Sequence, residues 1–502
     1  MSIKKCSTHI ICFEFYSNTT FLHIHIMTEN TGNLGPSVYL TNRNYQGNQL
    51  QENLSKRFKW NESPYTRAMK DDKYTNNEDN ELFSNQISYM KMKKLEENIV
   101  KDVVSGKNSL HRSIAPILKL AKLIALLPVQ GTTSRNTSYL VFNWFSWTVI
   151  YVVIVLTSTF LILSLSFYKV YQTGLTYYST VNIVFFGSSL VIYILFVQLA
   201  KEWPNIMRKW ELAEREMRQF GHPLHTALKF KLLTSLIMVL AIFEHIASIL
   251  KVVDKAINCS TDSANMFRVY FAVSFNQVYS VVNFSWFIAL PIVFLNLIIT
   301  CAWNFMDLFI IILSCALADR FKQLNQRLAL VKGKVLPSTY WRKSRETYNL
   351  LASLTRDFDE FLSPVILLSF ANNLYFICLQ LFNSLKPMHN VWEALYFVYS
   401  FSYLVGRTCA VSLYAASIND ESKIPKYVLF SVPSESYCVE VSRFITQVTS
   451  DELALTGYRF FSVTRTLMLT VAGTIVTYEI VLVQFNSVTN DVIQQNNTLD
   501  CP

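Results

Sequence analysis

Seven long apolar stretches constrain this chain more than any other feature of its sequence. Each is about 20 residues or longer, the length that a helix needs to cross a hydrocarbon core about 30 Å thick. They lie near residues 144–167, 181–200, 230–250, 284–317, 364–385, 392–416 and 463–485. Hydrophobic residues make up 51% of the chain, charged residues only 16%, and the mean hydropathy is +0.25, which no soluble surface tolerates. The sequence therefore predicts an all-α membrane protein with seven transmembrane helices.

Lysine and arginine indicate how these helices are oriented. Residues 201–229 and 318–356, which follow the second and fourth stretches, are rich in both, whereas the alternate connections hold few. Basic loops remain on the cytoplasmic side. The amino terminus is therefore expected in the cytoplasm and the carboxyl terminus outside. The net charge of +10 follows mainly from this bias and requires no nucleic acid partner.

The ends of the chain and its cysteines suggest little chemistry. Residues 1–106 are rich in Asn, Lys, Glu, Asp and Ser without a sustained apolar period, which predicts a disordered cytoplasmic tail. Among the nine cysteines only Cys259 and Cys501 fall in expected outer segments, where they either pair or remain free thiols. The others lack the paired spacing of a zinc site. We expect no metal and no cofactor.

Amphipathic stripes extend the predicted helices into the cytoplasm. Apolar residues recur every three or four positions in three segments: Phe321, Leu324, Leu328 and Val331; Tyr348, Leu351, Thr355, Phe358 and Leu362; and Val441, Phe444, Ile445 and Val448. Residues 332–337 separate the first two, and Ser363 with Pro364 predicts the start of the fifth span. Such stripes either form a lid within one chain or pack between chains. We favour an oligomerising anchor.

The last apolar stretch has one polar side. Thr470, Gly473, Thr474, Thr477, Val481 and Gln484 recur at spacings of three and four. Small and polar residues on one side are typical of helix packing or of a narrow aqueous path. Because Gln484 continues the stripe near the outer end, we interpret it as pore-lining, with Phe485 as bulk for a gate. Glu479 lies off the stripe and is expected to pack against a neighbouring helix.

Three motifs resemble one family over roughly residues 107–487. The segment TYEIVLVQF (477–485) resembles the carboxyl-terminal signature of insect gustatory receptors, and its glutamate resembles that of the sugar-receptor branch. GRTCAVSLYAASINDESKIP (406–425) and ALADRFKQLNQRL (316–328) are also similar to that branch. The resemblance implies a plasma-membrane, sugar-gated, non-selective cation channel of four identical or related subunits. Its ligands would be mono- or disaccharides, its permeants monovalent and divalent cations, and its pocket would lie among spans two to six.

A sugar pocket requires aromatic faces for apolar ring surfaces and polar groups for hydroxyls. Candidates in the outer halves of the spans are Glu244, His245, Trp286, Asn372, Asn373, Tyr375, Gln380, Trp392, Glu393, Tyr396 and Tyr399. Each has a simpler explanation: Trp286 and Trp392 suit an interfacial belt, and Glu244 with His245 suits a structural pair. Asp307 lies deeper and is expected to pack rather than to bind ligand.

These expectations divide the chain into successive parts. They are a tail (1–106), ligand-binding helices with span four (107–316), a cytoplasmic hairpin (317–362), spans five and six (363–416), anchor helices (417–462), the pore-lining span (463–486) and an extracellular tail (487–502). Phosphate loops, metalloprotease motifs and nucleophile elbows are not found, which argues against an enzyme. A seven-span receptor that signals through a partner and a transporter remain the alternatives.

Overall fold

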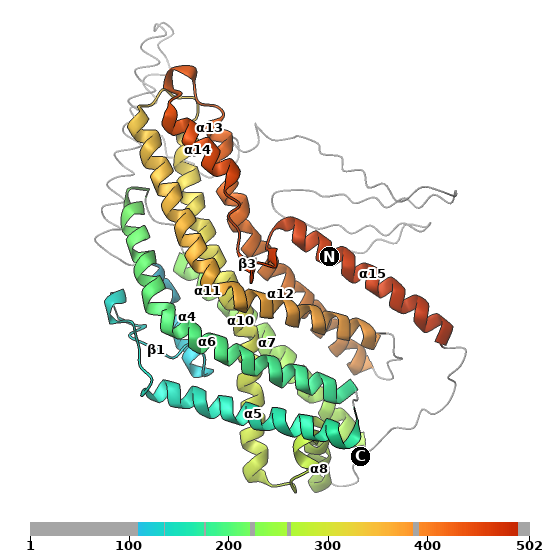
Figure 1. Ribbon diagram of the computed structural model, residues 1–502. Helices are drawn as coiled ribbons and strands as arrows, with labels where there is room; N and C mark the ends of the chain where they lie inside the picture. Colours follow the sequence, from blue (N-terminus) through green and yellow to red (C-terminus); the bar gives the residue numbers. More distant parts are fainter. Residues whose placement is uncertain are drawn as a thin grey trace, which may run out of the picture. The chain divides into compact units, whose positions relative to one another are not determined.

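A computed structural model describes residues 109–134, 136–174, 177–220, 226–258, 263–384 and 391–489 (Figure 1). Within helices, side chains are not described at 177–178, 219–220, 258, 263–265, 391–392, 479 and 482–489. The longer helices are α4 (Leu110–Leu123), α5 (Trp147–Thr173), α6 (Tyr177–Glu216), α7 (Thr226–Asn258), α8 (Ser263–Ser274), α10 (Trp286–Leu330), α11 (Ser338–Ser384), α12 (Val391–Lys423), α14 (Val439–Ser450) and α15 (Arg465–Thr489). Short helices are α9 (Asn276–Tyr279) and α13 (Pro425–Leu429). Two antiparallel hairpins, β1 (Val129–Gln130) with β2 (Val141–Phe142) and β3 (Thr456–Gly457) with β4 (Phe461–Ser462), are the strands of this part.

Each predicted span coincides with a long helix. Five helices, α5, α6, α7, α10 and α11, are long and apolar enough to cross a membrane. The sixth and seventh predicted spans lie on α12 and α15. The protein is thus mostly helical, with five strong candidate spans in its described part and two further helices where the sequence predicts the others.

Helices α10 and α11 extend well beyond a bilayer thickness. The predicted continuation of the fourth span is confirmed, because α10 runs to Leu330. The predicted helix start at Ser363 and Pro364 is wrong, since α11 passes through both without interruption. Proline removes the hydrogen bond to the carbonyl of Glu360, and the Ser363 hydroxyl lies 3.5 Å from that carbonyl as a substitute donor. The proline is therefore tolerated inside the helix.

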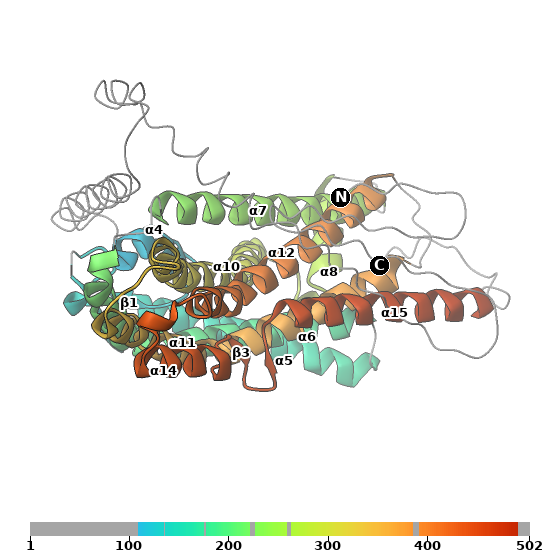
Figure 2. The same ribbon diagram turned by 90° about the horizontal axis from the view of Figure 1, so that it is seen from above.

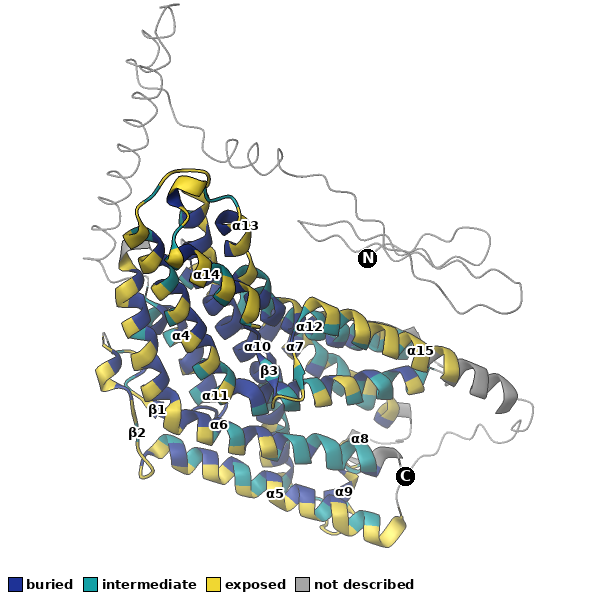
Figure 3. Cartoon of the chain, turned by 45° about the horizontal axis from the view of Figure 1, so that its top comes forward, coloured by how far each residue is buried: buried dark blue, intermediate teal, exposed yellow. Residues whose placement is uncertain are grey.

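Except for the half-buried Val331 and Ile445, the residues of the three amphipathic stripes are buried within one chain. Figure 3 shows buried residues in dark blue on α10 and α11. The Tyr348 ring of α11 lies 5.9 Å from the Phe321 ring of α10 and 5.4 Å from the Phe444 ring of α14. Leu324 is 0% exposed and Leu351 1% exposed. These stripes accordingly form a core within one chain. Assembly of several chains through this region remains a prediction, and it would require surfaces other than the stripes.

Leu324→Asp should destabilise this core strongly. The substitution removes a fully buried side chain and places a carboxylate among apolar groups, which together cost about 3–5 kcal/mol. Leu330→Asp, on the same helix where the side chain is 65% exposed, is the matched control and should be nearly neutral. Thermal stability in detergent, followed by size-exclusion chromatography, measures both. Equal stability of the two variants would contradict the core.

Among its described side chains, helix α15 packs against the rest of the chain along one side. Its packed residues are Leu467, Met468, Val471 and Ile475, and Ile475 joins a small apolar cluster with residues of α11 and α12. The predicted polar stripe lies roughly 120° around the helix at about 100° per residue, and its described members Thr470, Gly473, Thr474, Thr477 and Val481 are all exposed. Figures 1 and 2 both show α15 at the margin of the helices. The polar side of α15 is therefore free for other contacts.

Candidate ligand site and a buried polar network

Polar side chains follow one side of α12, where α12 packs against α7, α10 and α11. They recur at helical spacing, at Tyr396, Tyr399, Ser400, Tyr403 and Arg407. Their partners lie on the three neighbouring helices and form two groups. The outer group lies toward the end of the helices that the sequence predicts to face outward, and the deeper group lies farther from that end.

The outer group surrounds Glu244 of α7. Glu244 Oε1 accepts hydrogen bonds from the Ser400 hydroxyl at 3.0 Å and the Tyr396 hydroxyl at 3.4 Å. Gln380 Nε2 of α11 donates to Ser400 Oγ at 3.0 Å, whereas Gln380 Oε1 is buried without a hydrogen-bond partner in the described part of the chain. A carboxylate, an amide and two hydroxyls thus converge from three helices, and this combination can bind the hydroxyls of a polar ligand.

Two tyrosines connect α12 to the backbone of α7 below this group. Tyr399 donates to the carbonyl of Leu240 at 2.8 Å, and the Tyr403 hydroxyl lies 3.2 Å from the carbonyl of Ile237. The two rings are stacked, with centroids 6.5 Å apart and planes 7° from parallel. These contacts, about one turn apart on each helix, align the two helices and hold Ser400 opposite Glu244.

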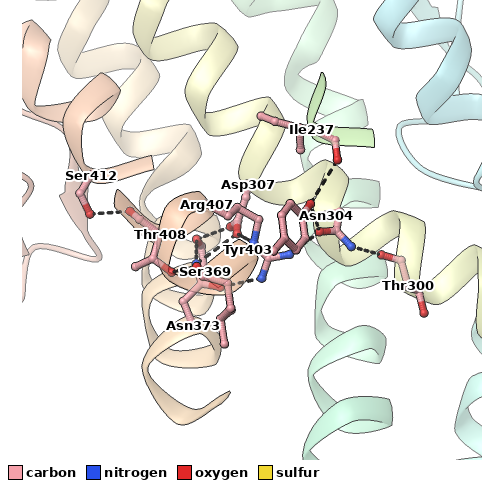
Figure 4. A network of polar contacts seen from close by, with 11 residues as sticks. Ile237, Thr300, Asn304, Asp307, Ser369, Asn373, Tyr403, Arg407, Thr408 and Ser412 are labelled. Carbon is pink, nitrogen blue, oxygen red and sulfur yellow. Dashed lines mark hydrogen bonds and ion pairs between the residues drawn. The ribbon is translucent and has the colours of Figure 1, made fainter. Parts of the chain in front are cut away.

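The deeper group is centred on an ion pair that is almost completely buried. Arg407 Nε of α12 lies 2.8 Å from Asp307 Oδ2 of α10, and their side chains are 2% and 0% exposed. The other aspartate oxygen accepts from Ser369 Oγ of α11 at 2.5 Å. Figure 4 shows the Ser369, Asn373 and Arg407 side chains gathered around Asp307.

Amides complete the network around the arginine. Asn373 Nδ2 donates to Asp307 Oδ2 at 3.1 Å, and Asn373 Oδ1 accepts from Arg407 Nη2 at 2.9 Å. Asn304 Oδ1 accepts from Arg407 Nη1 and from Tyr403 at 2.8 Å. The guanidinium also lies 4.6 Å from the centre of the Trp303 ring. Because a buried charge is costly unless it is paired and hydrogen bonded, this arrangement offsets the desolvation of both charges.

The two groups follow the same pair of helices. Gln380 and Asn373 are seven residues apart on α11, and Ser400 and Arg407 are seven apart on α12. Seven residues are two turns, so the groups are separated by roughly 10 Å along both helices. A ligand that changed the hydrogen bonds of the outer group would act on the helices that hold the buried ion pair.

The structure brings several of the predicted ligand residues together. Glu244, Gln380, Tyr396 and Tyr399 share the outer group or its tyrosine contacts. Glu393 forms an ion pair with Lys251 at 3.1 Å, and the Lys251 amine lies 5.4 Å from the Tyr396 ring, so this pair borders the same group.

The remaining candidates lie elsewhere or are already bonded. Asn373 belongs to the deeper network, and the buried Asn372 has an Nδ2 without a hydrogen-bond partner in the described residues. Trp286 is half exposed within an aromatic cluster, and its ring lies 5.3 Å from the Phe284 ring. His245 is buried on α7, and the Tyr375 ring packs edge-on against Phe376. Only the backbone of Trp392 is described. A ligand role for all these residues stays a prediction.

The sequence interpretation missed Arg407, Ser400, Tyr403 and Asn304. One signal was present: Asp307 and Arg407 are opposite charges inside two separate apolar stretches, and such residues tend to pair with one another. Neutral residues such as Ser400 carry no comparable signal, since serine is also common as a small residue in helix packing.

The fold defines the class of the protein. It resembles the solved structure of the insect olfactory receptor OR5 from Machilis hrabei in complex with eugenol, with a TM-score of 0.55 and 13% identity over 76% of this chain and 100% of that one. A second solved structure of the same receptor gives a TM-score of 0.56 and 14% identity over 75% of this chain and 99% of that one. The chain is accordingly a multi-pass helical membrane protein with the fold of an insect olfactory receptor.

The family follows from the sequence comparisons. A profile of the family described as "Trehalose receptor" matches residues 92–496. The "Gustatory receptor for sugar taste 64f" of Drosophila melanogaster is 38% identical over 80% of this chain and 84% of its own length, and the "Gustatory receptor 5a for trehalose" of the same organism is 35% identical over 78% and 87%. The chain belongs to the trehalose receptor family of gustatory receptors. Its relatives are receptors, which makes it a receptor and not an enzyme.

Proposed function

We propose that the chain is a sugar-taste receptor of the plasma membrane that acts as a ligand-gated, non-selective cation channel. The observation that supports this most strongly is the family relationship, because the similar Drosophila receptors are named for sugar taste and for trehalose. A mono- or disaccharide binds from outside among α7, α11 and α12. Four identical or related subunits surround a pore lined by α15, with the amino terminus inside and the carboxyl terminus outside.

Two features of the described chain support a channel over the alternatives. The polar side of α15 is exposed, as a pore-lining helix requires before subunits assemble. The inner end of α15 is tied to α12 by an ion pair between Arg465 Nε and Asp420 Oδ2 at 2.6 Å. Binding at the outer end of α12 can therefore be transmitted along one helix to the pore helix.

Sugar-evoked current in an excised patch without nucleotide tests the channel. A receptor that signals through a partner would lose its response in such a patch, and a transporter would move sugar without a large cation conductance. An epitope tag at the carboxyl terminus, detected on intact cells, tests the topology separately. A tag accessible only after permeabilisation would exclude the proposed orientation.

Glu244→Gln should shift the sugar dose response to about tenfold higher concentration. The amide retains the shape of the side chain but loses the charge that strengthens hydrogen bonds from sugar hydroxyls, a change of roughly 1.5 kcal/mol. Glu346→Gln, an exposed position on α11 where the side chain is 61% accessible, is the matched control and should leave the response unchanged. Normal sugar sensitivity of Glu244→Gln at normal surface abundance would move the pocket elsewhere.

A further inference from the structure

A cluster of exposed aromatic residues lies where the chain enters α5. Trp144 is 53% exposed, Phe145 94% and Trp147 85%, while Ser146 between them is buried and caps the helix by accepting from Val149 N at 3.4 Å. The cap fixes where α5 begins. These large rings are therefore held outward by local structure, and together we name them the entry cluster.

One basic side chain lies over this cluster. Lys201 of α6 is exposed, and its Nζ lies 4.6 Å from the centre of the Trp144 ring, within cation–π distance. Glu202, the next residue, points about 100° away around the helix. Glu211, farther along α6, already accepts from Thr137 and Arg215. Lys201 thus presents a positive charge beside the rings.

The packing of α5 on α6 places this group at a membrane boundary. Leu163 of α5 packs against Gly187 of α6, where an added Cβ would lie 3.9 Å from Leu163 Cδ1. The two helices run in opposite directions, so moving about 14 residues forward from Gly187 on α6 and back from Leu163 on α5 reaches the same level. Lys201 therefore lies level with Val149. Lys201 is also the first charged residue after the apolar part of α6. The lysine and the entry cluster accordingly mark the same end of both apolar segments.

An apolar path leads from the entry cluster along the free side of α5. Ile150, Ile154 and Leu161 recur at helical spacing and are 44%, 57% and 63% exposed. Acyl chains pack along such a surface, whereas a soluble phosphate has no apolar part that could contact it. The juxtaposition of a cation, aromatic rings and an apolar path matches a phospholipid with an anionic headgroup.

We propose that the entry cluster and Lys201 bind an anionic phospholipid of the cytoplasmic leaflet. The headgroup contacts the lysine amine, the tryptophans lie at headgroup level, and the acyl chains follow Ile150 and Ile154. The choice of leaflet rests on the proposed topology, which puts this end of α5 inside, where anionic lipids are concentrated. The binding itself does not depend on that orientation.

Native mass spectrometry of the full chain in detergent, mixed with phosphatidylserine or phosphatidylcholine, tests the site. The parent chain should retain phosphatidylserine preferentially, and Lys201→Gln should weaken that binding about fivefold, as expected for one lysine near a membrane surface. Lys201→Arg should keep the preference. Lys169→Gln is the matched control, because Lys169 lies at the other end of α5 and contacts Asn276; it should behave like the parent.

Three results would overturn the proposal: equal retention of both lipids by the parent chain, an unchanged preference in Lys201→Gln, or the same loss in Lys169→Gln. A change of assembly state in Trp147→Ala with no change in lipid retention would instead assign the cluster to contact with another copy of the chain. The measurement is made in detergent, without leaflets and without sugar. Its outcome is therefore independent of the epitope-tag test of topology and of the sugar-evoked current recordings.

Discussion

Arg407→Leu should abolish most folded protein at the cell surface. The substitution leaves Asp307 with a side chain that is 0% exposed and without its cationic partner. Removing one member of a buried pair costs about 3–5 kcal/mol, a large share of the stability of a typical domain. Surface abundance and thermal stability in detergent measure the effect.

Two further variants separate the burial of the charge from the mere loss of an arginine. Arg465→Leu removes an arginine whose ion pair with Asp420 is half exposed, at 53% and 38%, and should cost less than about 1 kcal/mol. The double change Asp307→Leu with Arg407→Met removes both buried charges and should recover much of the lost stability. Wild-type stability of Arg407→Leu, or no recovery in the double variant, would contradict the assigned role of the pair.

Shortening both Gln484 and Phe485 to alanine should produce a standing current in the absence of sugar. The backbone of α15 covers both positions, which lie near its carboxyl-terminal end, and their side chains are outside the described part of the chain. If four copies of this helix surround the pore, these residues form its narrow outer ring, and smaller side chains widen the closed gate. Recordings without ligand measure the change. Leu469→Ala with Val476→Ala, on an exposed side away from the polar stripe, is the control and should remain closed.

Cysteine scanning shows which side of α15 faces the pore. A cysteine at 484 or 477 should react with an extracellular thiol reagent mainly when sugar opens the channel. The parent chain gives the background reaction of its own cysteines. A cysteine at 476 should not. Glu479, whose side chain is likewise outside the described part, should affect expression or gating more than ion selectivity when changed to glutamine. Inert behaviour at 484 in both states, with loss of cation preference in Glu479→Gln, would show that another side of the helix lines the pore.

The sequence by itself determined the class of the protein and which segments lie on its long helices. Apolar stretches of sufficient length predict spans because an unpaired backbone cannot cross a bilayer, and this requirement holds whatever the helices pack against. The stripes at Phe321 and Tyr348 likewise predict helical extensions, since their spacing reflects local backbone geometry. The free polar side of α15 was visible in the spacing of its threonines, whose hydroxyls bond back to their own helix, as Thr474 Oγ1 does to the Thr470 carbonyl at 2.9 Å.

Only the tertiary structure decided which polar residues meet. Asn372 and Asn373 are adjacent and alike in sequence, yet Asn373 bonds the buried ion pair while Asn372 has an amide nitrogen without a partner in the described residues. The amphipathic stripes pose the same question: their period shows that they are buried but not whether the partner is the same chain, and in the structure it is α14 and the neighbouring helices of that chain. The physical reason is that periodicity depends on one helix alone, whereas a hydrogen bond such as Ser400 to Glu244 depends on the rotation and depth of two helices more than 150 residues apart in the chain.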